Sequence, residues 1–389
     1  MKKGFFFNGI ILLLTAEFLK VYLIMPFPGS QLTDKTQFAY FLHVNIWWIR
    51  CLGIGLIAPY LPEIFRKKSW LVKICWLIPV FIYLLVFYFT HFKLLADKMF
   101  LVMETKEMLP VSSSKVSTDK LAVCIDYKGN QRAYPIEIIG YHHQVFDTVS
   151  GDPLFITYCT VCRTGRIYKP VINGKQEKFR LVGMDQFNAM FEDETTKSWW
   201  RQATGEAITG SMKGQALPQV LFSQMTLKEW INKYPATLIL QPDPKFQNRY
   251  DHLNGFDDGS IKGGLEHRDS SSWEKKSWVV GITLPNRSVA VDWNLLQNKK
   301  IISENDFILI LLGDNNGFYA FSTLVDNQFQ EFEYDRQNAT LTDKSTNSTW
   351  NLEGICVDGI KEGKELKRLP ASQEFWHSWK SFQPATSRH

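Results

Sequence analysis

Cys159 and Cys162 form a Cys-x-x-Cys pair, which has the clearest capacity for chemistry of any arrangement in this sequence. Two thiols at this spacing can bind a metal ion, or they can cycle between a dithiol and a disulfide. The same pair can also close a turn as a purely structural staple. All three alternatives stay open at the level of the sequence.

Histidines close to the pair are the candidate third ligands for a metal ion. His142 and His143 end a predicted helical segment shortly before the strand that leads into Cys159. Two cysteines and one histidine with an open position are typical of catalytic zinc, and soft thiolates equally suit Cu(I). We therefore expect zinc or copper, and otherwise no cofactor.

Acidic residues complete the candidate site. Asp193 and Glu206 lie downstream of the cysteines, and we expect one of them to be an acid–base partner. His142 would then be a third metal ligand or a base. The predicted catalytic set comprises Cys159, Cys162, His142, Glu206 and Asp193.

Two familiar forms of Cys-x-x-Cys chemistry are disfavoured by the residues that follow. Thioredoxin-like proteins place the first cysteine at a helix N-terminus, but the stretch after Cys162 predicts a turn into a strand. A c-type haem site has histidine directly after the second cysteine, where this chain has Arg163. Arg163 and Arg166 could still stabilise a thiolate by their charge.

An internal repeat separates residues that the scaffold needs from residues that chemistry needs. Residues 205–237 match residues 354–386 without a gap, with shared glycines, a shared tryptophan and a Pro-Ala-Thr end. Such recurring residues form turns and fill cores. The cysteines do not recur, since the corresponding stretch is residues 308–318. A staple essential to the fold should be needed twice, so the asymmetry favours a functional pair.

The elements that must position the site are short strands and short helices. From Leu121 onward, apolar runs alternate with turn signals, as in the hairpin around Gly129-Asn130 and the helix that follows Pro135. This pattern predicts an α+β fold, mainly antiparallel and built twice. The expected organisation is a three-span anchor (1–92), a tether (93–120), a first half with the cysteine site (121–242), a linker (243–277) and a second, site-less half (278–389).

The first hundred residues predict a membrane anchor. Three apolar runs, about 5–25, 39–60 and 70–92, each reach the length of about 20 residues that a bilayer requires. Lys2 and Lys3 precede the first run, and basic residues 66–68 separate the second from the third. The positive-inside rule then places everything after the third run outside the cytoplasm. The lipid bilayer is the expected partner, together with a possible membrane-protein partner.

Charged residues argue for and against several partners. The formal net charge of +5 is mild and scattered, which excludes nucleic acid as an expected partner. Glu17 and Arg50 fall at similar depths of antiparallel spans, so we expect an ion pair between helices, with a proton or electron pathway as the alternative. Whether Cys124 and Cys356 pair is not decided by the sequence.

A set of short motifs lies in the part of the chain after the anchor. The segments are Ala133-Tyr134-Pro135, His142 with Asp147-Thr148, Thr157-Tyr158-Cys159 with Cys162, and a block running from Asp193 through Ser198, Trp200, Gln202 and Thr204-Gly205-Glu206-Ala207-Ile208 to Gly210. In these segments the chain resembles the bacterial family called domain of unknown function 3179. The resemblance covers residues 121–240 well and 279–386 more loosely. It implies a fold and a candidate site but no reaction, and it places the anchor in the bacterial cytoplasmic membrane with a periplasmic soluble domain.

Four positions depart from the family's pattern. Arg163 follows the second cysteine, where the family usually has glycine, and His143 follows His142, where the family usually has glutamate. Phe146 stands in place of Asn, and Asn188 stands in place of Asp.

The leading hypothesis is a membrane-anchored extracytoplasmic protein with a metal-binding or thiol-redox site around Cys159, Cys162 and His142. The alternative is a non-catalytic binding or scaffold module of a membrane complex, in which the cysteine pair only staples a loop.

Overall fold

The computed structural model describes residues 2–313 and 315–389. The chain divides into two compact units. Unit 1 contains the residues up to Val102 together with Val171–Leu217, and unit 2 contains Met103–Pro170 together with Pro218–His389. The chain therefore returns to unit 1 for one segment between its two passages through unit 2.

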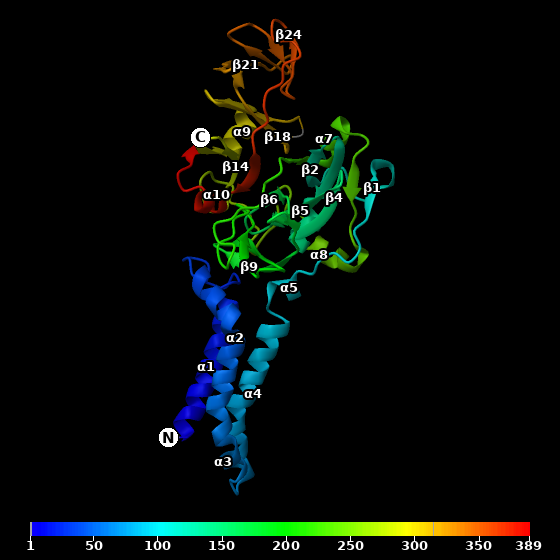
Figure 1. Cartoon of the computed structure of the whole chain (residues 1–389). Coiled ribbons are helices and arrows are strands. Elements are labelled where there is room, and N and C mark those ends of the chain that lie inside the picture. The colour runs from blue at the N-terminus through cyan, green and yellow to red at the C-terminus, as the bar shows by residue number, and fades with distance from the viewer. Residues whose placement is uncertain (1, 314) are drawn as a thin grey trace. The chain divides into compact units, whose positions relative to one another are not determined.

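Unit 1 begins with three helices that are long and apolar enough to cross a membrane (Figure 1). The first is α1 (Lys2–Tyr22). The second is α2 (Thr36–Ile57), which continues through η1 (Ala58–Tyr60) into α3 (Leu61–Phe65), and the third is α4 (Trp70–Phe92). The short α5 (Ala96–Met99) follows them. Side chains such as Phe6, Leu13 and Tyr60 pack between the helices, whereas many other large apolar side chains on them are exposed. Exposed apolar faces suit contact with lipid. The three predicted apolar helices are confirmed as candidate membrane spans.

A polar cluster ties the three long helices together. Glu17 accepts hydrogen bonds from Arg50 Nε (2.6 Å) and from Thr90 Oγ1 (2.9 Å). The Arg50 guanidinium also lies over the rings of Trp47 and Phe87. Charges at membrane depth are costly unless they are paired, so this contact sets how the helices meet. The predicted Glu17–Arg50 ion pair is confirmed.

The returning segment of unit 1 forms a three-stranded antiparallel sheet that packs on the start of α2. Its strands are β9 (Phe179–Asp185), β10 (Asn188–Asp193) and β11 (Trp199–Arg201), preceded by the small hairpin of β7 (Val171–Ile172) and β8 (Lys175–Gln176). Gln37 Nε2 donates to Ile208 O (2.7 Å), and the Tyr40 ring meets Trp199 edge-on.

Unit 2 begins with a five-stranded sheet in the order β1-β13-β3-β2-β12. Its elements are β1 (Met108–Pro110), η2 (Val111–Ser113), β2 (Leu121–Tyr127), β3 (Asn130–Pro135), α6 (Ile136–His142), β12 (Ser223–Thr226), α7 (Leu227–Lys233) and β13 (Leu238–Leu240). The hairpin of β2 and β3 turns at Lys128-Gly129, both with positive φ, because such a two-residue turn matches the twist of the strands. Thr226 caps α7 by accepting from Glu229 N.

A second sheet of unit 2 carries the cysteines. It consists of β4 (Gln144–Val149), β5 (Asp152–Cys159) and β6 (Thr164–Tyr168) in antiparallel order. β5 is buried along its last six residues, which explains its nearly continuous apolar sequence. After the segment that returns to unit 1, and after β13, the chain continues through η3 (Pro244–Phe246) and α8 (Gln247–Asp251).

The remainder of unit 2 is a second set of sheets (Figure 1). Its elements are β14 (Trp278–Thr283), β15 (Ser288–Asp292), α9 (Trp293–Lys299), β16 (Ile301–Ser303), β17 (Phe307–Leu311), β18 (Phe318–Ser322), β19 (Leu324–Val325), β20 (Gln328–Phe329), β21 (Phe332–Asp335), β22 (Thr340–Asp343), β23 (Thr349–Trp350), β24 (Cys356–Asp358), β25 (Ala371–Phe375), α10 (Trp376–Phe382) and β26 (Ser387–Arg388). One core joins the two sets, since Met225 and Trp230 pack in the same cluster as Tyr319 and Trp350.

Strand pairing in the second set repeats that in the first. β14 pairs antiparallel with β15 and with β25, and β15 pairs parallel with β26. β2 relates in the same way to β3 and β12, and β3 pairs parallel with β13. The predicted α+β, mainly antiparallel fold is confirmed, whereas origin by duplication and the predicted domain boundaries stay predictions.

Candidate functional site

Cys159 and Cys162 lie at the two ends of a tight turn between β5 and β6. Cys159 is the last residue of β5 and pairs with Thr164, the first residue of β6. Arg163 N donates to Thr160 O (3.2 Å), which closes the turn. Both cysteines are present as thiols and are fully buried. The hairpin therefore holds two thiols on one turn in the interior of unit 2.

The wall over this turn comes from distant parts of unit 2. Phe375 N at the end of β25 donates to Cys162 O (3.0 Å). Lys276 Nζ donates to Val161 O (2.7 Å), and His377 Nε2 lies 3.2 Å from the same oxygen. The chain around Lys276 and the first turn of α10 thus cover the cysteine turn.

Burial sets the charge state of the thiols. Burial raises the pKa of the Cys162 thiol well above its usual range, and the hydrogen bond with the Cys159 thiol raises it further. The hydroxyl of Ser378 and the charge of Lys276 act in the opposite direction on that pKa. Burial also lowers the pKa of the Lys276 ammonium group. At neutral pH the Cys162 thiol is therefore in its neutral form, beside the half-buried Lys276 side chain.

Arg163 connects the cysteine turn to the rest of unit 2. Its φ of +55° is a conformation that glycine adopts without strain, which accounts for the glycine expected there from the family resemblance. The buried guanidinium donates to Gln373 Oε1 (2.7 Å), Phe256 O (2.7 Å) and Asp257 O (2.9 Å). It also lies 3.8 Å from the centre of the Trp278 ring. The three hydrogen bonds and the stacking contact of the side chain thus offset the strain of the positive φ.

A buried ion pair holds β25 against the same hairpin. Arg166 Nη2 lies 2.5 Å from Glu374 Oε1, and both side chains are almost completely buried. Glu374 also accepts from Thr164 Oγ1 (3.1 Å) and from Ser372 Oγ (2.7 Å). The carboxylate is therefore surrounded by donors from both strands, which suits a buried charge.

The predicted histidines end α6 close to the cysteine strand. The carbonyl of His143 accepts from Tyr158 N (3.1 Å), the residue before Cys159. His142 Nε2 lies 2.8 Å from the Tyr250 hydroxyl, and His143 Nδ1 lies 3.1 Å from Tyr141 O. Both imidazoles are buried. Their predicted roles as ligands or base stay predictions.

Buried ionisable groups of unit 2 predict how its stability varies with pH. Burial lowers the pKa of both His143 and His377 to about 4, so their contributions to stability are present above about pH 6.5 and are lost as the pH falls toward 4. Burial raises the pKa of Asp257 to about 6, and its contribution has the opposite sign because it grows as the pH falls through 6. The stability lost through the two histidines exceeds the stability gained through the one carboxyl group.

We therefore expect the thermal unfolding midpoint of the detergent-solubilised protein to decrease as the pH is lowered from 7 to 5. Each histidine should lower the free energy of unfolding by about 2 kcal/mol at pH 5. Replacing His143 with Asn should reduce the steepness of this fall, and replacing Asp257 with Asn should increase it. Thermal unfolding measured across this pH range tests the signs, and a midpoint that rises toward pH 5 would contradict them.

Asp193 and Glu206 belong to unit 1, whereas the cysteines and histidines belong to unit 2. Asp193 Oδ2 accepts from Trp200 Nε1 (2.9 Å), and the carboxylate also binds Thr196 and Ser198 N. Asp343 makes the matching contacts with Trp350 and Thr346 in β21–β23. This recurrence indicates a scaffold role for Asp193 in its turn.

Glu206 has a different environment from the buried Asp193. Its carboxylate is about half exposed, and it lies 3.8 Å from Arg201 Nη1. Its backbone N–H donates to Thr204 Oγ1 (3.4 Å), so the residue lies at a turn. A role as acid–base partner stays a prediction for both acids.

The described residues contain no preformed set of metal ligands. Within residues 2–313 and 315–389, no group of three or more His, Cys, Asp and Glu side chains is close enough to hold a metal ion. Cys124 and Cys356 are also present as thiols. Among the described residues, the cysteine turn thus contains a pair of thiols rather than a preformed set of three ligands.

Sequence reasoning missed the residues that cover the turn. Lys276, Glu374, His377 and Ser378 lie more than a hundred residues after the cysteines. One signal was present, because His377 and Ser378 stand in the repeated segment at the places of Lys228 and Glu229. His377 and Ser378 thus differ between the two repeats, as the cysteines do, and this difference marks them as candidate site residues.

Comparison with known proteins covers most of the chain. A family model described as "Protein of unknown function (DUF3179)" matches residues 104–386, which begin after α5 and include both sets of sheets. No curated protein and no solved structure matches the chain. The matched range contains the cysteine turn and every residue that covers it. The chain, a protein with three helices able to cross a membrane, therefore belongs to the family of unknown function DUF3179.

Proposed function

We propose that this protein is a membrane-anchored thiol-redox protein in which Cys159 and Cys162 exchange two electrons with a disulfide of a second protein. The observation that carries the proposal is that two buried thiols, hydrogen-bonded to each other, lie at the two ends of one tight turn. Neighbouring thiols can form a disulfide without large movement of the backbone. The corresponding strands β17 and β18 lack both cysteines, which supports a role beyond the scaffold.

The proposed reaction is thiol–disulfide exchange. One thiol of the pair loses its proton and attacks a sulfur of the partner's disulfide, and the sulfur that leaves takes up a proton. The second thiol then loses its proton and attacks the mixed disulfide. The second partner sulfur leaves and takes up a proton. Cys159 and Cys162 end as a disulfide, the partner ends as a dithiol, and two electrons have passed to the partner.

Burial determines when this exchange can take place. A fully buried thiol with a raised pKa reacts slowly, because the thiolate is the nucleophile. Lys276 beside the turn favours the thiolate by its charge. We propose that reaction follows displacement of the covering chain around Lys276, so that a docked partner both exposes and activates the pair.

A metal site is the alternative to the redox proposal, and copper is the metal that the two thiols would favour. Two thiolates are soft ligands and suit Cu(I), and the nearby Lys276 would offset part of their negative charge. Zinc would require further ligands.

The location on the periplasmic side of a bacterial membrane, expected from the basic residues, is also part of the proposal. Disulfides persist in such compartments, so a partner with a disulfide would be present there.

A redox titration of the full-length protein in mild detergent tests the proposal. The protein is equilibrated at a series of dithiothreitol ratios and quenched in acid, and its free thiols are counted by the mass added on alkylation. We expect two thiols to disappear together in a two-electron transition. Cys159→Ser and Cys162→Ser should each abolish the transition, whereas Cys124→Ser with Cys356→Ser, also buried thiols of unit 2, should leave it intact.

Metal content and folding of the same samples separate the alternatives. Stoichiometric copper or zinc that disappears in the Cys159→Ser/Cys162→Ser variant would replace the redox proposal with a metal site. A loss of stability of about 2–5 kcal/mol in that variant, with no reversible transition in the wild type, would indicate a structural staple.

A further inference from the structure

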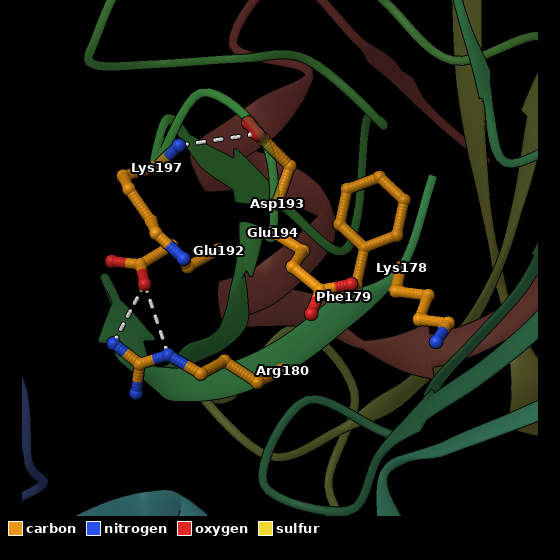
Figure 2. A pocket seen from close by; sticks show the side chains of 7 residues that line it. All are labelled: Lys178, Phe179, Arg180, Glu192, Asp193, Glu194 and Lys197. Carbon is orange, nitrogen blue, oxygen red and sulfur yellow. Dashed lines mark hydrogen bonds and ion pairs between the residues drawn. The ribbon is translucent and has the colours of Figure 1, made fainter. Parts of the chain in front are cut away.

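A cavity of about 280 Å³ opens in unit 1 beside the β9–β10 pair (Figure 2). Its lining residues are Lys178, Phe179, Arg180, Glu192, Asp193, Glu194 and Lys197. This volume lies just below the range of about 300–1,000 Å³ typical of drug-sized ligands. The cavity therefore suits a small polar group, and six of its seven lining residues carry a charge.

The buried charges of the cavity are compensated within the protein. Arg180 binds Glu192 through Nε (2.9 Å) and Nη2 (2.8 Å). Burial alone would raise the pKa of Glu192, but hydrogen bonds from His43 and Trp199 and the charge of Arg180 lower it to about 2. Asp193 is held by Trp200 and by the turn that follows it. These groups form a preorganised wall rather than a reactive centre.

Two lysines and one glutamate of the cavity remain outside these contacts. Within the described part of the chain, no ion pair involves Lys178 Nζ, Lys197 Nζ or the Glu194 carboxylate. All three side chains are exposed. In the view of Figure 2, Lys178 and Lys197 lie on opposite sides of Glu194. The cavity thus presents two cationic groups and one anionic group to a ligand.

The β21–β22 pair of unit 2 provides an internal comparison. Its Asp343 pairs with Phe332 as Asp193 pairs with Phe179, so Glu331 and Lys344 take the places of Lys178 and Glu194. Glu331 and Lys344 form an ion pair of 2.6 Å.

The cations of the cavity have no counterpart in that second pair. Glu333 stands at the place of Arg180, and Asn347 stands at the place of Lys197. The turn and its aspartate recur while the three cations do not, so the fold does not require the cations.

The cavity lies at the end of the candidate membrane spans. His43 of α2 contacts Glu192 of the cavity wall (3.1 Å), and Asp97 of α5, just after α4, lies 3.5 Å from Arg180. One helical turn further along α2, the side chains of Trp47 and Trp48 are largely exposed. The span continues from Trp47 to Phe65, about the length of chain that a bilayer requires, and exposed tryptophans are typical of the membrane interface. A turn of helix rises about 5 Å, so with this stretch in a bilayer the cavity would lie at the depth of the lipid headgroups.

We propose that this cavity binds the headgroup of a membrane phospholipid, with Lys178 and Lys197 on the phosphate and Glu194 on a headgroup ammonium, as in phosphatidylethanolamine. Arg180 and Glu192 hold the wall between the sheet and α2. The bound lipid would fasten the β9–β11 sheet to the bilayer surface. This site is independent of the cysteine pair, so it stands or falls separately from the redox proposal.

Lipid retention by the full-length protein in mild detergent tests the site. Native mass spectrometry counts dioleoyl phosphatidylethanolamine molecules bound during a titration, with dioleoylglycerol as the ligand that lacks phosphate. We expect one lipid to bind in preference to the diacylglycerol. Lys178→Gln/Lys197→Gln should weaken this binding at least tenfold, and the charge-reversing Lys178→Glu/Lys197→Glu should abolish it. Lys344→Gln/Lys364→Gln removes two exposed lysines of unit 2 and should bind as the wild type does.

Three outcomes would overturn the proposal. Equal retention by Lys178→Gln/Lys197→Gln with an unchanged thermal midpoint would exclude a role for the lysines. Equal binding of dioleoylglycerol would exclude recognition of the phosphate. Complete displacement of the lipid by millimolar inorganic phosphate or glycerophosphoethanolamine would identify a soluble phosphate compound, rather than a lipid, as the ligand.

Discussion

Replacing Arg163 with Gly should destabilise the protein by about 3–5 kcal/mol, although glycine is the residue that suits the backbone there. The substitution relieves the strain of a positive φ, which is a gain of about 1 kcal/mol. It also leaves Gln373 Oε1 and the carbonyls of Phe256 and Asp257 without their donor. Each buried acceptor left without a partner costs about 1–3 kcal/mol, so the losses exceed the gain.

Unfolding of the full-length protein in detergent, followed by tryptophan fluorescence, measures the change. Asn347→Gly is the matched control, since Asn347 has the same φ of +55° but is exposed. This control should leave the midpoint unchanged or raise it slightly. An Arg163→Gly variant at least as stable as the wild type would mean that backbone strain outweighs the contacts of the guanidinium.

Glu374→Leu should cost about 3–5 kcal/mol, because it takes the carboxylate away from the buried guanidinium of Arg166. The same loss is expected for Arg166→Met, which leaves the Glu374 charge buried without its cation. The double variant should recover most of the stability, since a buried ion pair can be replaced by apolar side chains at little cost. A double-mutant cycle would then give a coupling of at least 2 kcal/mol.

The exposed pair of Lys364 and Asp326, 2.9 Å apart, is the control for this cycle. Neutralising both of its members should leave the midpoint unchanged, because exposed pairs are screened by solvent. Additive losses at Arg166 and Glu374 would contradict the prediction. They would mean that the hydrogen bonds to Thr164 and Ser372, rather than the ion pair, hold β25 against the cysteine hairpin.

Local features of the sequence predicted the anchor and much of the secondary structure. The three spans follow from runs of apolar residues, a property of neighbouring positions alone. The hairpin of β2 and β3 follows from its turn residues, although the turn lies at Lys128-Gly129 rather than one residue later. The ion pair of Glu17 and Arg50 followed from counting depth along helices.

Contacts between distant segments could not be predicted in the same way. β1 lies in the predicted tether yet pairs with β13, because an edge strand is completed by whichever segment reaches it. Residues 171–217 pack with the spans in unit 1, although their sequence continues the first half. No local pattern encodes either pairing.

The candidate site shows the same division. The sequence by itself determined the three long apolar helices, the α+β class, the cysteine pair and the helix that ends beside the cysteine strand, because each depends on residues close together in the chain. Only the tertiary structure decided that Lys276, Glu374 and Ser378 surround the turn, that both thiols are buried, and that a charged cavity opens beside α2. Burial and charge state depend on which distant side chains pack around a group, and that packing is settled only when the whole chain folds.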